Sequence, residues 1–133
     1  MKQVLLKNVL VGLVLMGLMT PMVWAQKRVK FPKGQTSVIL KGRTTGGPSE
    51  SGGMNPVAYV FRARRGQHLT LRLTSARKHA VFGLYAPGME LVEGAQGVTD
   101  WSGELPATGD YEIIVFPEDE RTNTTFALEI TIV

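Results

Sequence analysis

The chain has 133 residues, of which 44% are hydrophobic and 20% are charged, and its formal net charge is +4. These proportions are those of an ordinary globular protein, and they exclude a disordered tail, a coiled coil and a collagen-like fibre. The sequence has no cysteine, which excludes disulfide frameworks, thiolate zinc sites and cysteine nucleophiles.

The first 25 residues have the pattern of an export signal. Lys2 and Lys7 precede an apolar run over residues 9–19, and small residues follow where a signal peptidase cleaves. This order predicts a secretory signal peptide over residues 1–25, which is removed by cleavage. The alternative is a transmembrane anchor, which needs roughly 20 apolar residues, more than this run supplies. We therefore expect a periplasmic or secreted protein with no stable membrane anchor after cleavage.

The mature chain, residues 26–133, has the alternation of polar and apolar residues that is typical of half-buried strands. No stretch of it repeats apolar residues at helical spacing, and turn signals recur between the strands. We therefore predict one all-β domain, an antiparallel β-sandwich or jelly roll of eight or nine short strands. In chain order, the strands are expected over residues 29–31, 37–40, 57–63, 68–74, 80–85, 89–92, 98–102, 111–116 and 126–132.

One long segment of the mature chain has the composition of a loop. Residues 42–56 contain five glycines, two prolines and several serines and threonines. A connection of this length is uncommon in a small domain, and such loops are usually functional or mobile. A mobile surface loop without a role is the simpler interpretation.

Five segments stand in a characteristic order along the mature chain: residues 59–61 followed by 66–71, then 82–88, 105–113 and 126–130. Together they resemble the bacterial pre-peptidase C-terminal (PPC-like) family of β-sandwiches. The version of this fold that carries its own signal peptide resembles the small periplasmic inhibitors of goose-type lysozyme, whose chains begin in a similar way to residues 29–34. The resemblance implies a β-sandwich and a non-enzymatic role.

What the resemblance implies is a protein without cofactor that occludes the cleft of a lysozyme with loops at one end of the sandwich. The corresponding loops are residues 42–56 and 116–125. A glycosidase cleft carries carboxylates, with which arginine or hydroxyl donors can pair. The second loop is mostly acidic, which departs from this expectation and suits the basic outer surface of a lysozyme better. The candidate partner-binding residues are Arg43, Glu118, Asp119, Glu120 and Arg121.

The alternative function is that of a glycan-binding or envelope-assembly module with the same fold. Trp101 stands between Asp100 and Ser102, and an exposed indole beside a carboxylate can stack on a sugar ring. Arg62 and Arg64 are the candidate cationic partners of such a site. The competing interpretation is that Trp101 belongs to the core, because large aromatic side chains are mostly buried.

Charge is unevenly distributed along the mature chain. Residues 26–78 contain twelve Lys or Arg and one acid, whereas residues 79–133 contain one Arg and ten acids. A basic segment can indicate a nucleic-acid partner. In a sandwich, however, the two halves interleave and neighbouring strands cancel each other's charge, so we expect no nucleic-acid partner.

The sequence offers little for catalysis. His68 and His79 are the only histidines, and no serine lies in a nucleophile-elbow motif. Carboxylates for glycoside hydrolysis could be assembled from Asp100, Glu104 and Asp110, although nothing in their spacing requires it. We predict no catalytic residues.

Calcium is the metal that the composition fits best. Glu118, Asp119 and Glu120 could supply oxygen ligands together with Asp100 or Asp110. Adjacent acids in a loop are usually solvated charge, and the two histidines make a poor zinc site. We predict no metal and no cofactor, with calcium left as the open alternative.

Overall fold

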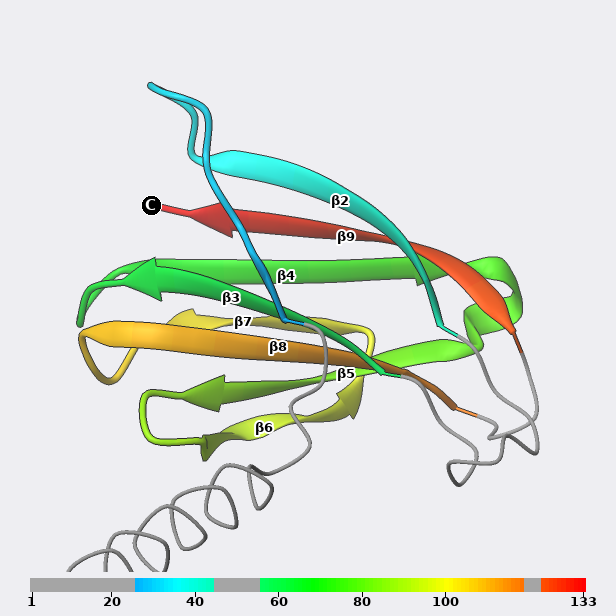
Figure 1. Ribbon diagram of the computed structural model, residues 1–133. Helices are drawn as coiled ribbons and strands as arrows, with labels where there is room; N and C mark the ends of the chain where they lie inside the picture. Colours follow the sequence, from blue (N-terminus) through cyan, green and yellow to red (C-terminus); the bar gives the residue numbers. More distant parts are fainter. Residues whose placement is uncertain (1–25, 45–55, 119–122) are drawn as a thin grey trace, which may run out of the picture.

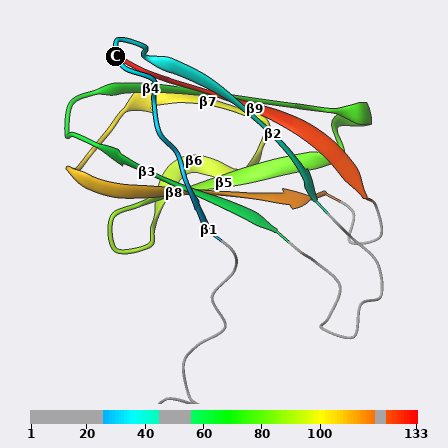
Figure 2. The same ribbon diagram turned by 45° about the horizontal axis from the view of Figure 1, so that its top comes forward.

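Apolar side chains occupy one face of most strands, and this pattern sorts the chain into two sheets packed face to face (Figure 1 and Figure 2). The structure, a computed structural model, describes residues 26–44, 56–118 and 123–133. The predicted all-β sandwich is confirmed, with nine strands in the part of the chain that the structure describes. The predicted signal peptide over residues 1–25 lies outside the described residues.

The two sheets differ in size. The five-stranded sheet has the order β1-β3-β8-β5-β6, and the four-stranded sheet has the order β2-β9-β4-β7. All neighbours pair antiparallel except β1 and β3, which are parallel. The strands are β1 (Gln26–Arg28), β2 (Ser37–Thr44), β3 (Val57–Ala63), β4 (His68–Ser75), β5 (Ala80–Ala86), β6 (Glu90–Val98), β7 (Asp100–Glu104), β8 (Gly109–Pro117) and β9 (Thr124–Ile132).

Helical structure is limited to one short 3-10 turn, η1 (Ala76–Lys78), among the residues that the structure describes. Over the same residues, no helix is long and apolar enough to cross a membrane.

Aromatic rings fill the space between the sheets. Phe61 and Tyr111, register partners on β3 and β8, stack with ring centroids 5.7 Å apart and an angle of 19° between planes. Tyr59 of the five-stranded sheet meets Phe126 of the four-stranded sheet edge to face, at 6.3 Å. Each fully buried side chain of this size contributes roughly 1.5–3 kcal/mol by leaving water. The core is therefore built from the inner faces of both sheets.

The five strands predicted at residues 57–63, 68–74, 80–85, 111–116 and 126–132 are found as β3, β4, β5, β8 and β9. In β3, β4 and β9 the apolar residues of one face are mostly buried and most polar residues of the other are not, as the sequence predicts. β5 and β8 are buried on both faces, and each lies between two other strands of the five-stranded sheet.

Two short strands were predicted wrongly at the edges of the sheets. Residues 29–31 alternate like a strand, but the strand is β1, which ends at Arg28. Val29 and Phe31 pack on the core instead, where the chain crosses from one sheet to the other (Figure 1). The alternation of polar and apolar residues over 29–31 therefore reflects the burial of Val29 and Phe31 at an open edge of the sandwich.

The second error concerns residues 89–102. The sequence predicts strands over 89–92 and 98–102, whereas β6 runs to Val98 and β7 starts at Asp100. Gly94 and Gly97 have positive φ values of 75° and 65° within β6, whose register against β5 shifts at two points. These glycines belong to an irregular edge strand, although in the sequence they have the appearance of a loop.

The buried hydroxyl of Tyr111 fastens the connection before β8. It donates to the Ala107 carbonyl oxygen at 2.7 Å and accepts from the Ala107 amide at 3.0 Å. The same contact, from a tyrosine to the backbone a few residues earlier, is the tyrosine corner of immunoglobulin-like sandwiches. It ties the entry of the central strand to the chain that leads into it.

Replacing Tyr111 with Phe should lower the free energy of unfolding by about 1–2 kcal/mol, because two backbone groups of Ala107 lose their partner. Urea unfolding followed by circular dichroism measures this. Tyr85→Phe is the matched control, since the Tyr85 hydroxyl makes no hydrogen bond with the described residues. An equal loss in both variants would contradict the role given to the Tyr111 hydroxyl.

Candidate binding surface at one end of the sandwich

Four connections meet at one end of the sandwich, which we call the loop end. Strands β2, β4, β6 and β8 end there, and β3, β5, β7 and β9 begin there (Figure 1). The pairing of Thr44 with Thr124 and of Ala80 with Pro117 fixes this arrangement. The segments between β2 and β3 and between β8 and β9, predicted to contact a partner, therefore leave the same end.

The structure corrects the position predicted for Arg43. The loop was expected to begin at residue 42, but β2 continues to Thr44, so Arg43 is a strand residue. Its side chain is exposed on the outer face of the four-stranded sheet, opposite Thr125. Arg43 therefore lies at the base of the predicted loop.

Gly42 explains why the strand continues. A Cβ atom at this position would lie 2.5 Å from Phe126 Cζ and 2.8 Å from Tyr59 Oη. The glycine thus makes room for two aromatic rings, and it does not mark a turn.

Burial raises the pKa of the Tyr59 phenol, whose oxygen has no hydrogen-bond partner among the described residues.

The acidic loop is described only at its start. Glu118 follows β8, and its backbone amide donates to the His79 carbonyl oxygen at 2.6 Å, which joins this loop to the β4–β5 connection. Asp119, Glu120 and Arg121 lie outside the described residues.

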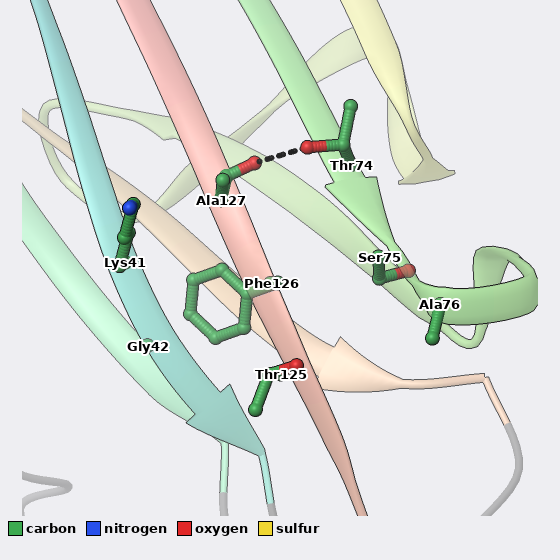
Figure 3. Close-up of a pocket in the computed structure, with 8 residues that line it drawn as sticks. All are labelled: Lys41, Gly42, Thr74, Ser75, Ala76, Thr125, Phe126 and Ala127. Carbon is green, nitrogen blue, oxygen red and sulfur yellow. Dashed lines mark hydrogen bonds between the residues drawn. The ribbon is translucent and has the colours of Figure 1, made fainter.

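Two hollows flank η1 at the loop end. The first, of about 510 Å³, lies on the outer face of the four-stranded sheet, where Lys41 and Thr74 stand on either side of the small Ala127 (Figure 3). The second, of about 460 Å³, lies on the other side of η1 and is lined by Lys78, Asp100 and Glu118 among others. Both are open to solvent along one side, which suits contact with a macromolecule better than enclosure of a small molecule.

Trp101 bridges the two sheets at their open edge. It is half-buried, packs against the core, and its indole nitrogen donates to the Glu93 carbonyl oxygen of β6 at 3.3 Å. The ring also lies over Gly103, where a Cβ would be 2.9 Å from the indole. These contacts support the interpretation of Trp101 as a structural residue that closes the edge between β6 and β7.

The other two residues of the predicted glycan site do not join Trp101. Arg62 lies on the outer face of the five-stranded sheet, and Arg64 lies in the β3–β4 turn at the end opposite the loop end. Trp101 belongs to the edge strand of the other sheet. The structure thus brings no sugar-binding surface together from these three side chains.

Acidic and basic residues face each other on the outer sheet surfaces. Arg28 donates to Asp110 at 3.0 Å, Arg62 is the register partner of Asp110, and Arg72 lies 3.9 Å from Asp100. The interleaving of the basic and acidic halves, expected from the sequence, is therefore seen in these pairs. A hydrogen bond from Arg28 holds the pKa of the Asp110 carboxyl below its ordinary value, with added attraction from the charges of Arg28 and Arg62.

The candidate catalytic and calcium-binding carboxylates are separated. Asp110 and Glu118 lie at opposite ends of β8, so they cannot share an ion, whereas Asp100 and Glu118 line one hollow. Asp100 and Glu104 are the two ends of β7, on a different sheet from Asp110. Over the described part of the chain, no group of three or more His, Asp or Glu side chains could hold a metal ion.

His68 has a hydroxyl neighbour that sequence reasoning missed. Its Nε2 lies 2.9 Å from Ser102 Oγ, on the exposed outer face of the four-stranded sheet. A serine nucleophile needs an acid that orients the histidine and donors for the oxyanion. No carboxylate among the described residues bonds to His68, so the pair is a surface contact.

Comparison with solved structures finds this fold in two periplasmic lysozyme inhibitors. PliG of Aeromonas hydrophila, a periplasmic inhibitor of g-type lysozyme, superposes with a TM-score of 0.66 at 27% identity, over 81% of this chain and 96% of that one. The fold is that of these inhibitors. PliG of Salmonella Typhimurium matches with a TM-score of 0.57 at 24% identity, over 81% and 97% of the two chains.

The wider resemblance predicted from the sequence is also found. The pre-peptidase C-terminal domain of a Bacillus anthracis collagenase superposes with a TM-score of 0.59 at 13% identity, over 84% of this chain and all of that domain. No family model matches the sequence, and a search of curated proteins by sequence finds no match. The likeness to PPC-like sandwiches and to PliG is therefore visible in the fold more than in the sequence.

Substitutions of Trp101 test its structural role through the free energy of unfolding. Trp101→Ala should lower the free energy of unfolding by about 2 kcal/mol, because a half-buried ring and its bond to Glu93 are lost. Trp101→Phe, which keeps a ring on Gly103 and loses only the indole donor, should lose about half as much. Chemical denaturation measures both. A Trp101→Ala variant as stable as the wild type would place the ring outside the packed edge.

The Arg28–Asp110 pair predicts a pH effect. Because the carboxyl pKa is lower in the folded than in the unfolded chain, the pair stabilises the fold above the ordinary carboxyl pKa, and this contribution disappears as the pH falls through the folded-state pKa. Arg28→Gln should raise the Asp110 pKa toward its ordinary value in an NMR titration. Arg43→Gln, remote from Asp110, is the control, and an unchanged Asp110 pKa in Arg28→Gln would refute the assignment.

Proposed function

We propose that the mature chain is a periplasmic protein that binds a lysozyme and inhibits it by covering its cleft. The observation that carries this proposal is the similarity to the Aeromonas hydrophila inhibitor, at 27% identity over nearly the whole of that protein. The other reported inhibitor shares the same fold. The proposed partner is a goose-type lysozyme, the class on which both of those proteins act according to their descriptions.

The arrangement of the chain at the loop end supports contact through loops. The segments after Thr44 and before Asn123 leave the sandwich from neighbouring strands, since β2 and β9 pair along their length. Arg43, exposed at the base of the first segment, and Glu118, at the start of the second, are the described members of the proposed interface. A loop pair on a rigid sandwich is a common way to present a binding surface.

Export fits the same proposal. Cleavage after residue 25 would leave Gln26, a residue of β1, at the start of the mature chain. Its side-chain amide donates to Glu112 Oε1 at 2.9 Å, and the cleaved chain keeps this contact. The proposed role needs neither a cofactor nor a catalytic residue, because inhibition follows from occupying the cleft.

Residues 26–133 should inhibit the lysis of peptidoglycan by a goose-type lysozyme in a turbidity assay. Inhibition should saturate near one inhibitor per enzyme, and chicken-type and invertebrate-type lysozymes serve as class controls. Arg43→Ala should weaken inhibition several-fold, whereas Lys33→Ala, an exposed cation at the opposite end, should leave it unchanged. A folded protein that inhibits none of the three classes would refute the proposed function.

A further inference from the structure

The connection between β4 and β5 holds an unusual backbone. Arg77 and Lys78 have φ values of 54° and 56°, in the left-handed region that side chains with a Cβ disfavour. Neither position is a glycine, although glycine would relieve the strain in both. Strained backbone of this kind persists only where the surrounding structure enforces it, and it is concentrated at functional sites.

Backbone contacts hold this turn in place. The His79 amide donates to the Ala76 carbonyl oxygen at 3.2 Å, the Ala80 amide to Ser75 Oγ at 3.1 Å, and the Glu118 amide to the His79 carbonyl oxygen at 2.6 Å. The turn is therefore fixed to β4, to β5 and to the loop after β8. Its conformation exists before any partner arrives, which lowers the entropic cost of binding.

The side chains of Arg77 and Lys78, by contrast, are not held by polar contacts with the described residues. Arg77 and Lys78 are exposed, and neither makes a hydrogen bond or an ion pair with the residues that the structure describes. Arg28 and Arg72, on the sheet faces, each lie against a carboxylate. Arg77 is thus a cation without an acidic partner among the described residues, whereas Lys78 shares the second hollow with Asp100 and Glu118.

The first hollow extends this positive surface. It begins at Ala76, passes over Ala127 and ends at Lys41, with the hydroxyls of Thr74 and Thr125 along it (Figure 3). No acid is among the described residues that line it, whereas the second hollow sets Asp100 and Glu118 beside Lys78. The Lys41 ammonium in this hollow and the Arg77 guanidinium next to Ala76 are donors of the kind that pair with an acidic side chain.

We propose that Arg77 and the first hollow, which begins at the neighbouring Ala76, form a third docking element, which receives an acidic segment of the lysozyme at the rim of its cleft. This inference rests on the proposed function, and it adds a contact that neither of the two loops supplies. The turn lies at the loop end, so an enzyme held by the loops would also face it. The element is cationic where the β8–β9 loop is acidic, so the two elements select opposite charges on the partner.

Charge reversal tests the proposal. Arg77→Glu should weaken inhibition of the goose-type enzyme by about tenfold at low salt, with a smaller effect at high salt, because the contact is electrostatic and partly exposed. Arg65→Glu is the matched control, since Arg65 is an exposed arginine in the β3–β4 turn at the opposite end. Its inhibition constant should stay within twofold of the wild type.

A second variant separates binding from stability. Arg77→Gly should relieve the left-handed strain and raise the melting temperature by roughly 3 °C, while weakening inhibition. A side chain with a purely structural role would not give opposite changes in these two quantities. Inhibition that is unaffected by both Arg77 variants, with an active wild type, would overturn this inference alone.

Two other outcomes would also overturn the proposed docking element. A wild-type protein that inhibits no lysozyme would overturn the proposed function and, with it, the docking element. If Arg77→Glu inhibits like the wild type but no longer binds heparin, used as a probe polyanion, the surface belongs to an anionic glycan and the inference is wrong.

Discussion

Apolar packing between the two sheets is the constraint on which the rest of the structure depends. The sequence has no cysteine, so the fold has no disulfide and is stabilised by what its strands bury. Only one face of most strands can take part, and the stacked rings of Phe61 and Tyr111 lie at the centre of that layer. The outer faces and the strand ends are thereby left for charged residues and for binding. The Tyr111 hydroxyl fixes the backbone at the start of β8, the central strand of the larger sheet.

The same packing determines where the binding surface begins. Tyr59 and Phe126 meet edge to face close to the loop end, and Gly42 admits both rings against β2. Because β2 is held there, it remains a strand as far as Thr44, which is fully buried and lies opposite Thr124. The two proposed binding loops therefore start from paired strand ends within the core. A loop with a fixed base loses less conformational freedom when it binds.

Alternation in the sequence was enough to predict the long strands, because one buried and one solvated face leave a period of two along β3, β4 and β9. It failed where glycine serves packing or an irregular edge, as at Gly42 and in β6. At Val29 and Phe31 it failed for the opposite reason, since these side chains pack against the core just after β1 ends, and of the two only the Val29 amide bonds to β3 among the described residues. The strained turn at Arg77 has no sequence signal, because its positive φ is imposed by contacts with β8 and β5 that only the folded chain creates.

The fold also determines where charged residues pair and where they do not. Basic residues precede acidic ones along the chain, yet the sandwich sets them on neighbouring strands, where pairs such as Arg28 with Asp110 neutralise the sheet faces. Cations that the described structure leaves without an acid then stand out at the loop end, with Arg43 on β2 and Arg77 on the β4–β5 turn. Two pairs, Arg28 with Asp110 and Arg72 with Asp100, balance charge on parts of the sheet faces, whereas a partner approaching the loop end meets Arg43 and Arg77 beside an acidic loop. Because opposite charges steer encounter and like charges penalise wrong partners, this arrangement favours one orientation of a protein partner over the others. The left-handed turn is held by backbone contacts on both sides, so the position of Arg77 at the loop end is set before any partner approaches, and less conformational freedom is lost on contact.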